Sequence, residues 1–180
     1  MRLFHVSEDP NITLFTPRCP IRADLDQSIG MVWAIDEVRL PNFITPRDCP
    51  RVTYHIGKDT TQTDIERFFS SSGVKHAVII EYSWLQAMQN TPLYLYEFDP
   101  TDFELQDAIA GYYVAKTAQK PIARHVITDL FKALSERNIE LRIVNDLWDI
   151  ADRVRASSLN WSLCRMKNAT PQNSKNEIPL

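Results

Sequence analysis

A chain of 180 residues is long enough to form one domain and to bury roughly 70% of the surface that it exposes when unfolded. Its hydrophobic content of 44% and charged content of 24% are close to the averages for soluble globular proteins. The net charge of -3 argues against a protein whose main partner is nucleic acid, because such proteins neutralise phosphates with clustered Lys and Arg.

The sequence favours a cytoplasmic protein without a membrane segment. No apolar run approaches the roughly 20 residues that span a bilayer, and residues 1–5 are too few and too polar for a signal peptide. The three cysteines, Cys19, Cys49 and Cys164, are odd in number and far apart, which is typical of a reduced protein rather than of a disulfide framework. The sequence does not specify an oligomeric state.

Hydrophobic periodicity predicts many short strands separated by short helices. Alternating or β-branched runs predict strands at residues 2–7, 12–15, 31–35, 51–56, 76–81, 92–98, 112–115 and 139–144. Helical spacing predicts helices at residues 63–70, 82–89, 124–137 and 146–155. Residues 17–26 are expected to be an irregular connection, and residues 103–110 a loop or one weak helix.

This order predicts the α+β class: a single domain with a mixed or antiparallel split sheet and flanking short helices, because strict βαβ alternation is absent. Thr63 is predicted to cap the helix at 63–70, with Glu66 completing a capping box. The domain is expected to cover residues 1–156. Residues 157–180 are expected to be a C-terminal extension that is partly mobile, because the pattern fades and the tail is polar.

The stretch from Met31 to His55 is the first candidate for a functional region. Two turns built around Pro41 and Pro46 separate its strands, so no long helix can cross the segment. Rigid scaffolds often carry working groups on such loops, which here hold Asp36, Glu37, Arg47 and Arg51. The alternative is that the prolines only shape a connection and that the adjacent acids face water.

His5 is the first candidate for chemistry. It lies on the first predicted strand with Ser7 on the same face, and an imidazole both donates and accepts hydrogen bonds near neutral pH. The alternative is a structural hydrogen-bonding histidine. Tyr112 is a candidate for stacking a planar ligand, and core packing is the default explanation for its ring.

Other common site types are weakly supported. His55, His76 and His125 have neither HExxH nor HxH spacing, so no metal site is predicted. Cys49 would be a nucleophile only with a histidine nearby, and a buried or surface thiol is the simpler interpretation. With four glycines and no GxGxxG or GxxxxGK[ST] pattern, a glycine-rich phosphate loop is excluded.

Two short strands resemble the opening of proteins with an ADP-ribosyltransferase-like fold: Leu3-Phe4-His5-Val6-Ser7 and Val32-Trp33-Ala34-Ile35-Asp36. The resemblance implies an ADP-ribosyltransferase-like fold in which the histidine of the first strand contacts the nicotinamide ribose of NAD. The chain is also similar, and more closely, to a family of uncharacterised bacterial, Bacillus-like proteins. The segments FHVSE, WAIDE, LPNF and TPRDCPRV carry that second similarity.

The chain departs from the transferase pattern at the catalytic acid. Active transferases of that fold place a glutamate on a late strand, where it supports positive charge that develops on the sugar. The corresponding strand here reads Ala110-Gly111-Tyr112-Tyr113-Val114, and Glu97, Glu104 and Asp107 lie elsewhere. Two hypotheses therefore stand: a transferase acting on NAD or a related nucleotide, and a non-catalytic binding or interaction module that has lost the acid.

The sequence predicts one cleft for a small nucleotide-like ligand. It specifies no cofactor with certainty, and NAD is the substrate that the resemblance implies. His5 is the candidate catalytic residue. The candidate ligand-binding residues are His5, Ser7, Trp33, Asp36, Arg47, Arg51 and Tyr112.

Overall fold

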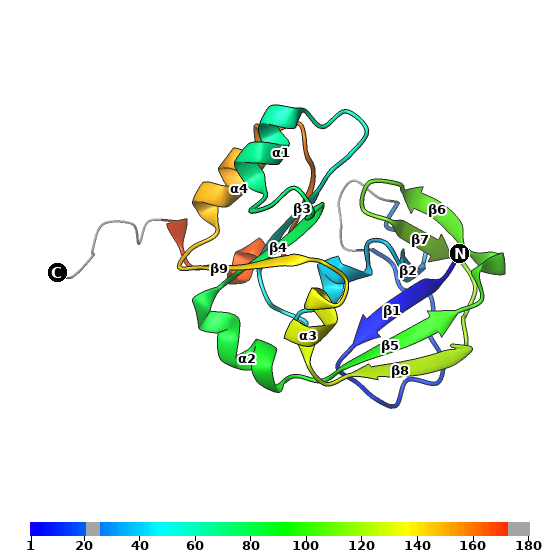
Figure 1. Cartoon of the computed structure of the whole chain (residues 1–180). Coiled ribbons are helices and arrows are strands. Elements are labelled where there is room, and N and C mark those ends of the chain that lie inside the picture. Colours follow the sequence, from blue (N-terminus) through cyan, green and yellow to red (C-terminus); the bar gives the residue numbers. More distant parts are fainter. Residues whose placement is uncertain (21–25, 173–180) are drawn as a thin grey trace. The chain divides into compact units, whose positions relative to one another are not determined.

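The computed structural model describes residues 1–20 and 26–172 (Figure 1). The irregular connection predicted around Asp24 and the end of the predicted mobile tail, residues 173–180, lie outside the described residues. The fold contains two sheets and short helices, which confirms the α+β class. The chain divides into two compact units: Met1–Ile44 with Pro92–Thr128, and Thr45–Thr91 with Asp129–Leu180.

The first unit is built on a six-stranded antiparallel sheet in the order β6-β7-β2-β1-β5-β8. Its strands are β1 (Leu3–Ser7), β2 (Val32–Asp36), β5 (Leu93–Phe98), β6 (Glu104–Asp107), β7 (Tyr112–Ala115) and β8 (Ala123–Ile127). A 3-10 helix, η1 (Leu40–Phe43), follows β2, and a second one, η3 (Pro100–Asp102), precedes β6.

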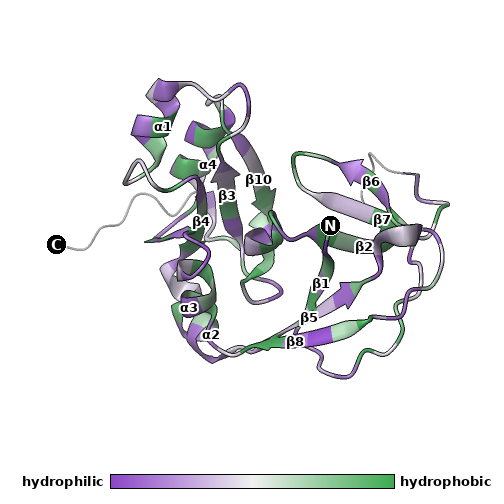
Figure 2. Ribbon diagram, turned by 45° about the vertical axis from the view of Figure 1, so that its right-hand side comes forward, coloured by the Kyte–Doolittle hydropathy of each residue, from purple (hydrophilic) through white to green (hydrophobic). Residues whose placement is uncertain are grey.

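Strand pairing fixes which side chains share a face of this sheet. Leu3 of β1 lies opposite Asp36 of β2 and Phe98 of β5, so these three side chains are on one face. The buried residues of that face form the first hydrophobic core: Leu3, Phe15, Val32, Ala34, Tyr96, Phe98, Phe103 and Ala115. The other face carries polar groups toward β8, and Figure 2 shows hydrophilic segments within β5 and β8.

The second unit contains a four-stranded mixed sheet in the order β10-β3-β4-β9, in which only β4 and β9 are parallel. Its strands are β3 (Arg51–His55), β4 (His76–Glu81), β9 (Glu140–Val144) and β10 (Asn160–Cys164). Its helices are α1 (Gln62–Phe68), α2 (Leu85–Asn90), α3 (Leu130–Ser135) and α4 (Trp148–Arg155), with short 3-10 turns η2 (Tyr82–Trp84) and η4 (Met166–Asn168).

One face of this sheet packs against α1 and α4. Val52 and Tyr54 of β3 join Ala77 and Ile79 of β4 in the second hydrophobic core, and Tyr54 donates its hydroxyl hydrogen to the carbonyl oxygen of Phe68 at 2.8 Å. Helices α2 and α3 pack beside each other, and α3 also contacts β9 (Figure 1). Side chains alternate along β3, so Val52 and Tyr54 point to this core, and Arg51, Thr53 and His55 point to the opposite face of the sheet.

Most predicted strands are confirmed, and the differences concern four segments. Residues 104–107 and 160–164 form strands where the sequence predicts none, and the second lies beyond the predicted domain boundary at residue 156. The predicted helix at 124–137 is wrong in its first half, which is strand β8. The predicted strand at 12–15 is wrong, because only Phe15 forms an isolated bridge, with Gln119.

The predicted capping box at Thr63 is also wrong. Helix α1 begins at Gln62, and its N-cap is Thr61, two residues before Thr63; the Thr61 hydroxyl oxygen accepts a hydrogen bond from the backbone N–H of Asp64 at 3.2 Å. In the described parts of the chain, none of the helices has the length and apolar character needed to cross a bilayer.

Candidate functional site

His5 lies in the middle of the first sheet, on the central strand β1 between β2 and β5. Its ring is half-buried, with its Nδ1 3.0 Å from the backbone carbonyl oxygen of Trp33 and its centroid 4.8 Å from that of Phe15. Because a carbonyl oxygen can only accept, Nδ1 carries the hydrogen of this bond. In the neutral ring Nε2 is then the hydrogen-bond acceptor, so the fold fixes both the tautomer and the direction of the imidazole.

The segment that carries Phe15 is held against this face of the sheet by polar contacts. Tyr96 lies opposite His5 on β5, donates its hydroxyl hydrogen to the carbonyl of Asp9 at 2.7 Å and accepts the backbone N–H of Ile12 at 3.1 Å. Ser7 is half-buried on the same face as His5, and its hydroxyl oxygen accepts the backbone N–H of Asp9 at 3.1 Å. The predicted shared face of His5 and Ser7 is therefore present.

The Trp33 side chain lies on the opposite face. Phe4 pairs with Ile35, so the register aligns His5 with Ala34 and turns the indole of Trp33 to the other side of the sheet. There the indole meets the ring of Tyr112 edge to face, with centroids 5.5 Å apart, and Tyr112 also contacts Phe43 at 5.9 Å. His5 thus meets the backbone of Trp33, and Trp33 with Tyr112 forms a separate aromatic group.

Asp36 shapes the turn after β2. Its Oδ1 accepts the backbone N–H of Arg39 at 2.7 Å, and its own N–H donates to the carbonyl of Gly111 at 3.0 Å. Gly111 has a φ of 71°, and a Cβ atom placed on it would lie 2.9 Å from Asp36 Oδ1. The contacts of this carboxylate are those of a turn-stabilising residue.

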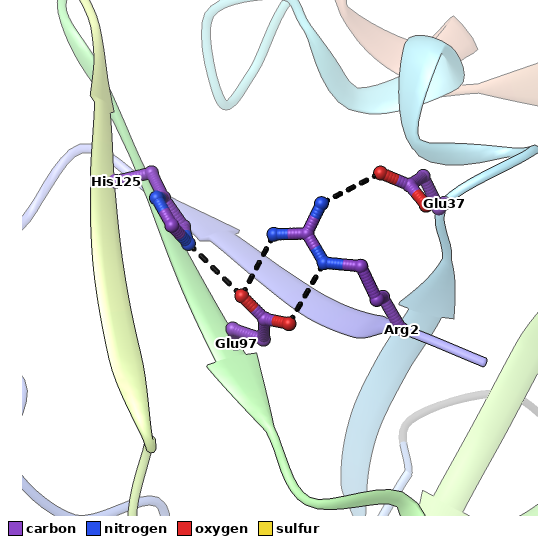
Figure 3. A network of polar contacts seen from close by, with 4 residues as sticks. All are labelled: Arg2, Glu37, Glu97 and His125. Carbon is purple, nitrogen blue, oxygen red and sulfur yellow. Dashed lines mark hydrogen bonds and ion pairs between the residues drawn. The ribbon is translucent and has the colours of Figure 1, made fainter.

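Two further carboxylates of the first unit, Glu97 and Asp107, are engaged in structural contacts. Glu97 is adjacent to Tyr96 on β5 and so points to the face opposite His5, where it binds Arg2 and His125 (Figure 3). Those partners hold the pKa of Glu97 down to about 2, first through the hydrogen bond from Arg2. Asp107 accepts two backbone N–H groups of its own turn, from Ile109 and Ala110.

Arg47 and Arg51 belong to the second unit. Arg47 is exposed on the loop before β3. Arg51 begins β3, is only 3% exposed and donates from Nη1 to the carbonyl oxygen of Cys49 at 3.0 Å.

Burial raises the pKa of the Cys49 thiol to about 12, although the Arg51 charge acts in the opposite direction. The nucleophilic interpretation of Cys49 needs a lowered thiol pKa, so this environment contradicts it.

One pair of polar residues is brought together by the fold without any pattern in the sequence that predicts it. His55 on β3 and His76 on β4 are directly opposite each other, both buried, with ring centroids 5.6 Å apart. Their separation of 21 positions matches no local motif, and only the pairing of β3 with β4 brings them together. The alternation of Arg51, Thr53 and His55 against Val52 and Tyr54 is the one signal in the sequence that could have indicated this polar face.

The model of a family described as a family of unknown function, DUF6886, matches residues 4–169. The chain belongs to this family. The match covers both units and every predicted site residue, which confirms the similarity to a family of uncharacterised proteins. No curated protein and no solved structure matches the chain.

The first unit of this DUF6886 protein has a small surface pocket with a volume of about 140 Å³. Its lining residues are Asp102, Glu104, Val114, Lys116 and Thr117. Lys116 and Glu104 form an exposed ion pair there, with Lys116 Nζ 3.7 Å from Glu104 Oε2. Ligand pockets usually have volumes of roughly 300–1,000 Å³, so this one is too small to enclose a dinucleotide. Across the described residues, no group of three or more His, Cys, Asp or Glu side chains is arranged to hold a metal ion.

Proposed function

We propose that this protein binds a nucleotide-like ligand at the face of the first sheet that carries His5, with NAD the ligand implied by the ADP-ribosyltransferase resemblance. The observation that carries the proposal is the hydrogen bond of 3.0 Å between His5 Nδ1 and the carbonyl oxygen of Trp33. It fixes the imidazole before any ligand arrives, and a fixed group loses less conformational entropy on binding.

The fixed tautomer suits a sugar hydroxyl. With the hydrogen on Nδ1, the neutral ring presents Nε2 as an acceptor, and a ribose hydroxyl is a donor of matching chemistry. Ser7 provides a second polar group on the same face, and Phe15 provides an aromatic wall against the ring. Trp33 and Tyr112 lie on the other face of the sheet, so the proposal assigns them no contact with a ligand at His5.

A non-catalytic binding module is the second candidate. Three carboxylates of the first unit favour it, because Asp36, Glu97 and Asp107 each accept hydrogen bonds that stabilise the fold. Glycosyl transfer needs a carboxylate near the sugar to support its developing positive charge. Binding without transfer needs only the fixed histidine and its neighbours.

Titration with NAD tests both candidates. We expect NAD to raise the unfolding midpoint of the unaltered protein and of the His125→Gln variant, and to bind the His5→Gln variant at least tenfold more weakly. His125 is a matched control because it is a half-exposed histidine on the opposite face of the same sheet. Release of nicotinamide would support transfer, and binding without release would support the module. Absence of NAD binding would overturn both.

A further inference from the structure

Strand β8 is one of the two edges of the first sheet, because the strand order ends with β5-β8 (Figure 1). Its inner side pairs with residues 93–97 of β5 without a register shift. In the described part of the chain, residues 123–127 make no backbone hydrogen bond other than those to β5. The outward N–H and C=O groups of an edge strand are available to any chain that can pair with them.

Large apolar side chains are exposed along this edge. Val126, which lies opposite Tyr94 of β5, is 51% exposed. Ile122, the residue before the strand, is 65% exposed, and its N–H donates to the carbonyl oxygen of Glu97 at 2.8 Å, which holds it beside β5. Exposed apolar side chains at an open strand edge favour pairing with a further strand.

The charge of this edge is positive. The exposed Arg124 donates to the carbonyl oxygen of Pro10, and its guanidinium carbon is 5.7 Å from the ring centroid of Tyr94. Lys120 is exposed just before the strand. Neither cation has a carboxylate partner among the described residues, and Glu97 points to the face of the sheet opposite Arg124. The edge therefore presents an uncompensated positive charge between two apolar side chains.

The other edge of the sheet, β6, is protected against such pairing. Its ladder with β7 has a register shift between Leu105 and Asp107. It carries the carboxylates of Glu104 and Asp107, and Glu104 pairs with Lys116. Bulges and charged side chains are usual means by which proteins block a sheet edge. Strand β8 has no register shift and no carboxylate, so the two edges differ in the features that prevent pairing.

We propose that β8 is a docking edge for an extended acidic segment of another protein, which adds to the first sheet as a further strand. Main-chain hydrogen bonds give affinity in this mode of recognition, and alternate side chains give specificity. A glutamate or aspartate opposite Arg124 forms a cross-strand ion pair, and the apolar residues on either side of it lie next to Val126 and Ile122.

A second copy of this chain is the poorer occupant. Pairing of β8 with another β8 places two Arg124 side chains on neighbouring strands without a carboxylate on either strand. Pairing with β6 of a second copy meets the register shift and the engaged carboxylates of that strand. The proposal goes beyond nucleotide binding at His5 and does not depend on it, because β5 separates β8 from β1.

A designed peptide tests the proposal. The probe is TVTETVT with blocked ends, which places a glutamate between two valines, and TVTKTVT is the control peptide. Each is titrated into the isotope-labelled full chain at constant ionic strength, and backbone nuclear magnetic resonance signals are followed. We expect TVTETVT to shift the signals of residues 122–127 and to bind at least fivefold more tightly than TVTKTVT. Equal affinities, no binding, or shifts that spare residues 122–127 would overturn the proposal.

Variants of exposed residues localise the binding. Val126→Lys places a second charge on the edge, and Arg124→Gln removes the cation; we expect each to weaken binding of TVTETVT at least fivefold. Leu105→Lys is the matched control, because Leu105 is an apolar side chain, 55% exposed, on the other edge of the same sheet. It should bind like the unaltered protein. An unchanged affinity in the two β8 variants would overturn the proposal.

Sedimentation of the unaltered protein over a range of concentrations distinguishes the two occupants. We expect a monomer at every concentration, since like charges oppose the pairing of two β8 strands. An oligomer that the Val126→Lys variant does not form would show that a second copy occupies this edge, and it would overturn the assignment of an acidic partner.

Discussion

The guanidinium of Arg2 donates two parallel hydrogen bonds of 2.8 Å to the carboxylate of Glu97, one to each oxygen (Figure 3). His125 Nε2 lies 2.9 Å from the same carboxylate, and Glu37 accepts from Arg2 at 2.7 Å. This network joins the start of the chain to β5, β8 and the turn after β2. It lies on the sheet face opposite His5, so its role is to hold strands together.

We predict that Glu97→Gln lowers the free energy of unfolding at neutral pH, because it removes the carboxylate that binds Arg2 and His125. The effect should be only about 1 kcal/mol, since the side chains of Arg2 and His125 are nearly half exposed and solvent weakens their interaction with Glu97. The pKa of Glu97 falls from its usual 4.5 to about 2 in the folded protein. Its contribution is therefore complete above pH 4.5 and is lost as the pH falls toward 2. Unfolding in urea between pH 7 and pH 2 measures this change.

The control for that experiment is Glu104→Gln, which removes an exposed carboxylate whose ion pair with Lys116 is long, at 3.7 Å. The difference in stability between the unaltered protein and the Glu97→Gln variant should shrink below pH 4.5. A difference that stays constant down to pH 2 would contradict the assignment.

Thr170 is predicted to fasten the C-terminal part of the second unit to β4. Its backbone N–H and its hydroxyl donate to the buried carboxyl group of Glu81 at 3.0–3.1 Å, and its carbonyl accepts from Trp148 Nε1 at 2.6 Å. Thr170→Val replaces only the hydroxyl, by a methyl group, and should lower the free energy of unfolding by about 1 kcal/mol. The exposed Thr13→Val is the matched control, and chemical denaturation of both variants measures the difference; equal midpoints would disprove this role.

Gly111 is predicted to tolerate no side chain. Its φ of 71° is unfavourable for other residues, and an added Cβ would lie 2.6 Å from Arg39 Cγ. We expect Gly111→Ala to destabilise the protein by roughly 1–3 kcal/mol. Gly73→Ala is the control because a Cβ there meets nothing within 4 Å. Thermal unfolding compares the two variants, and a Gly111→Ala protein as stable as the control would refute the argument.

Cys49 is predicted to react slowly with alkylating agents. Its thiol is fully buried, and its pKa is raised to about 12, so little thiolate exists at neutral pH. Cys19 is exposed and should be modified first by iodoacetamide at pH 7.5. Mass spectrometry of tryptic peptides follows both residues over time. Modification of Cys49 at the rate of Cys19 would contradict the burial argument and restore thiol chemistry as a hypothesis.

Local patterns were sufficient to predict strands whose two faces differ in polarity. The alternation in residues 92–98 predicted both β5 and its faces, and the β-branched run of Val78, Ile79 and Ile80 predicted β4. Strand β8 was missed because Val126, Ile127 and Leu130 also fit helical spacing. Its pairing with β5, from Leu93 with Ile127 to Glu97 with Ala123, is a non-local interaction that outweighs this local preference.

The candidate site also depends partly on local patterns and partly on strand pairing. Period-two alternation placed His5 and Ser7 on one face, as the structure has them. The side of the sheet taken by Trp33 depends on the register between β1 and β2, and a shift of one residue would reverse it. That register is set by pairs 31 positions apart, Phe4 with Ile35, which no local motif specifies. The opposition of His55 and His76 depends on strand pairing in the same way.

The interleaved order of the two units determines when each could be completed on a ribosome. Strand β1 is made well before its partner β5, which begins only at Leu93, and the first unit is not complete until Thr128 has been added. The second sheet is completed later still, because β10 follows β3, β4 and β9 in the sequence. Nascent chains that end before residue 160 therefore expose unpaired strand edges, and such edges are where chaperones would be expected to bind.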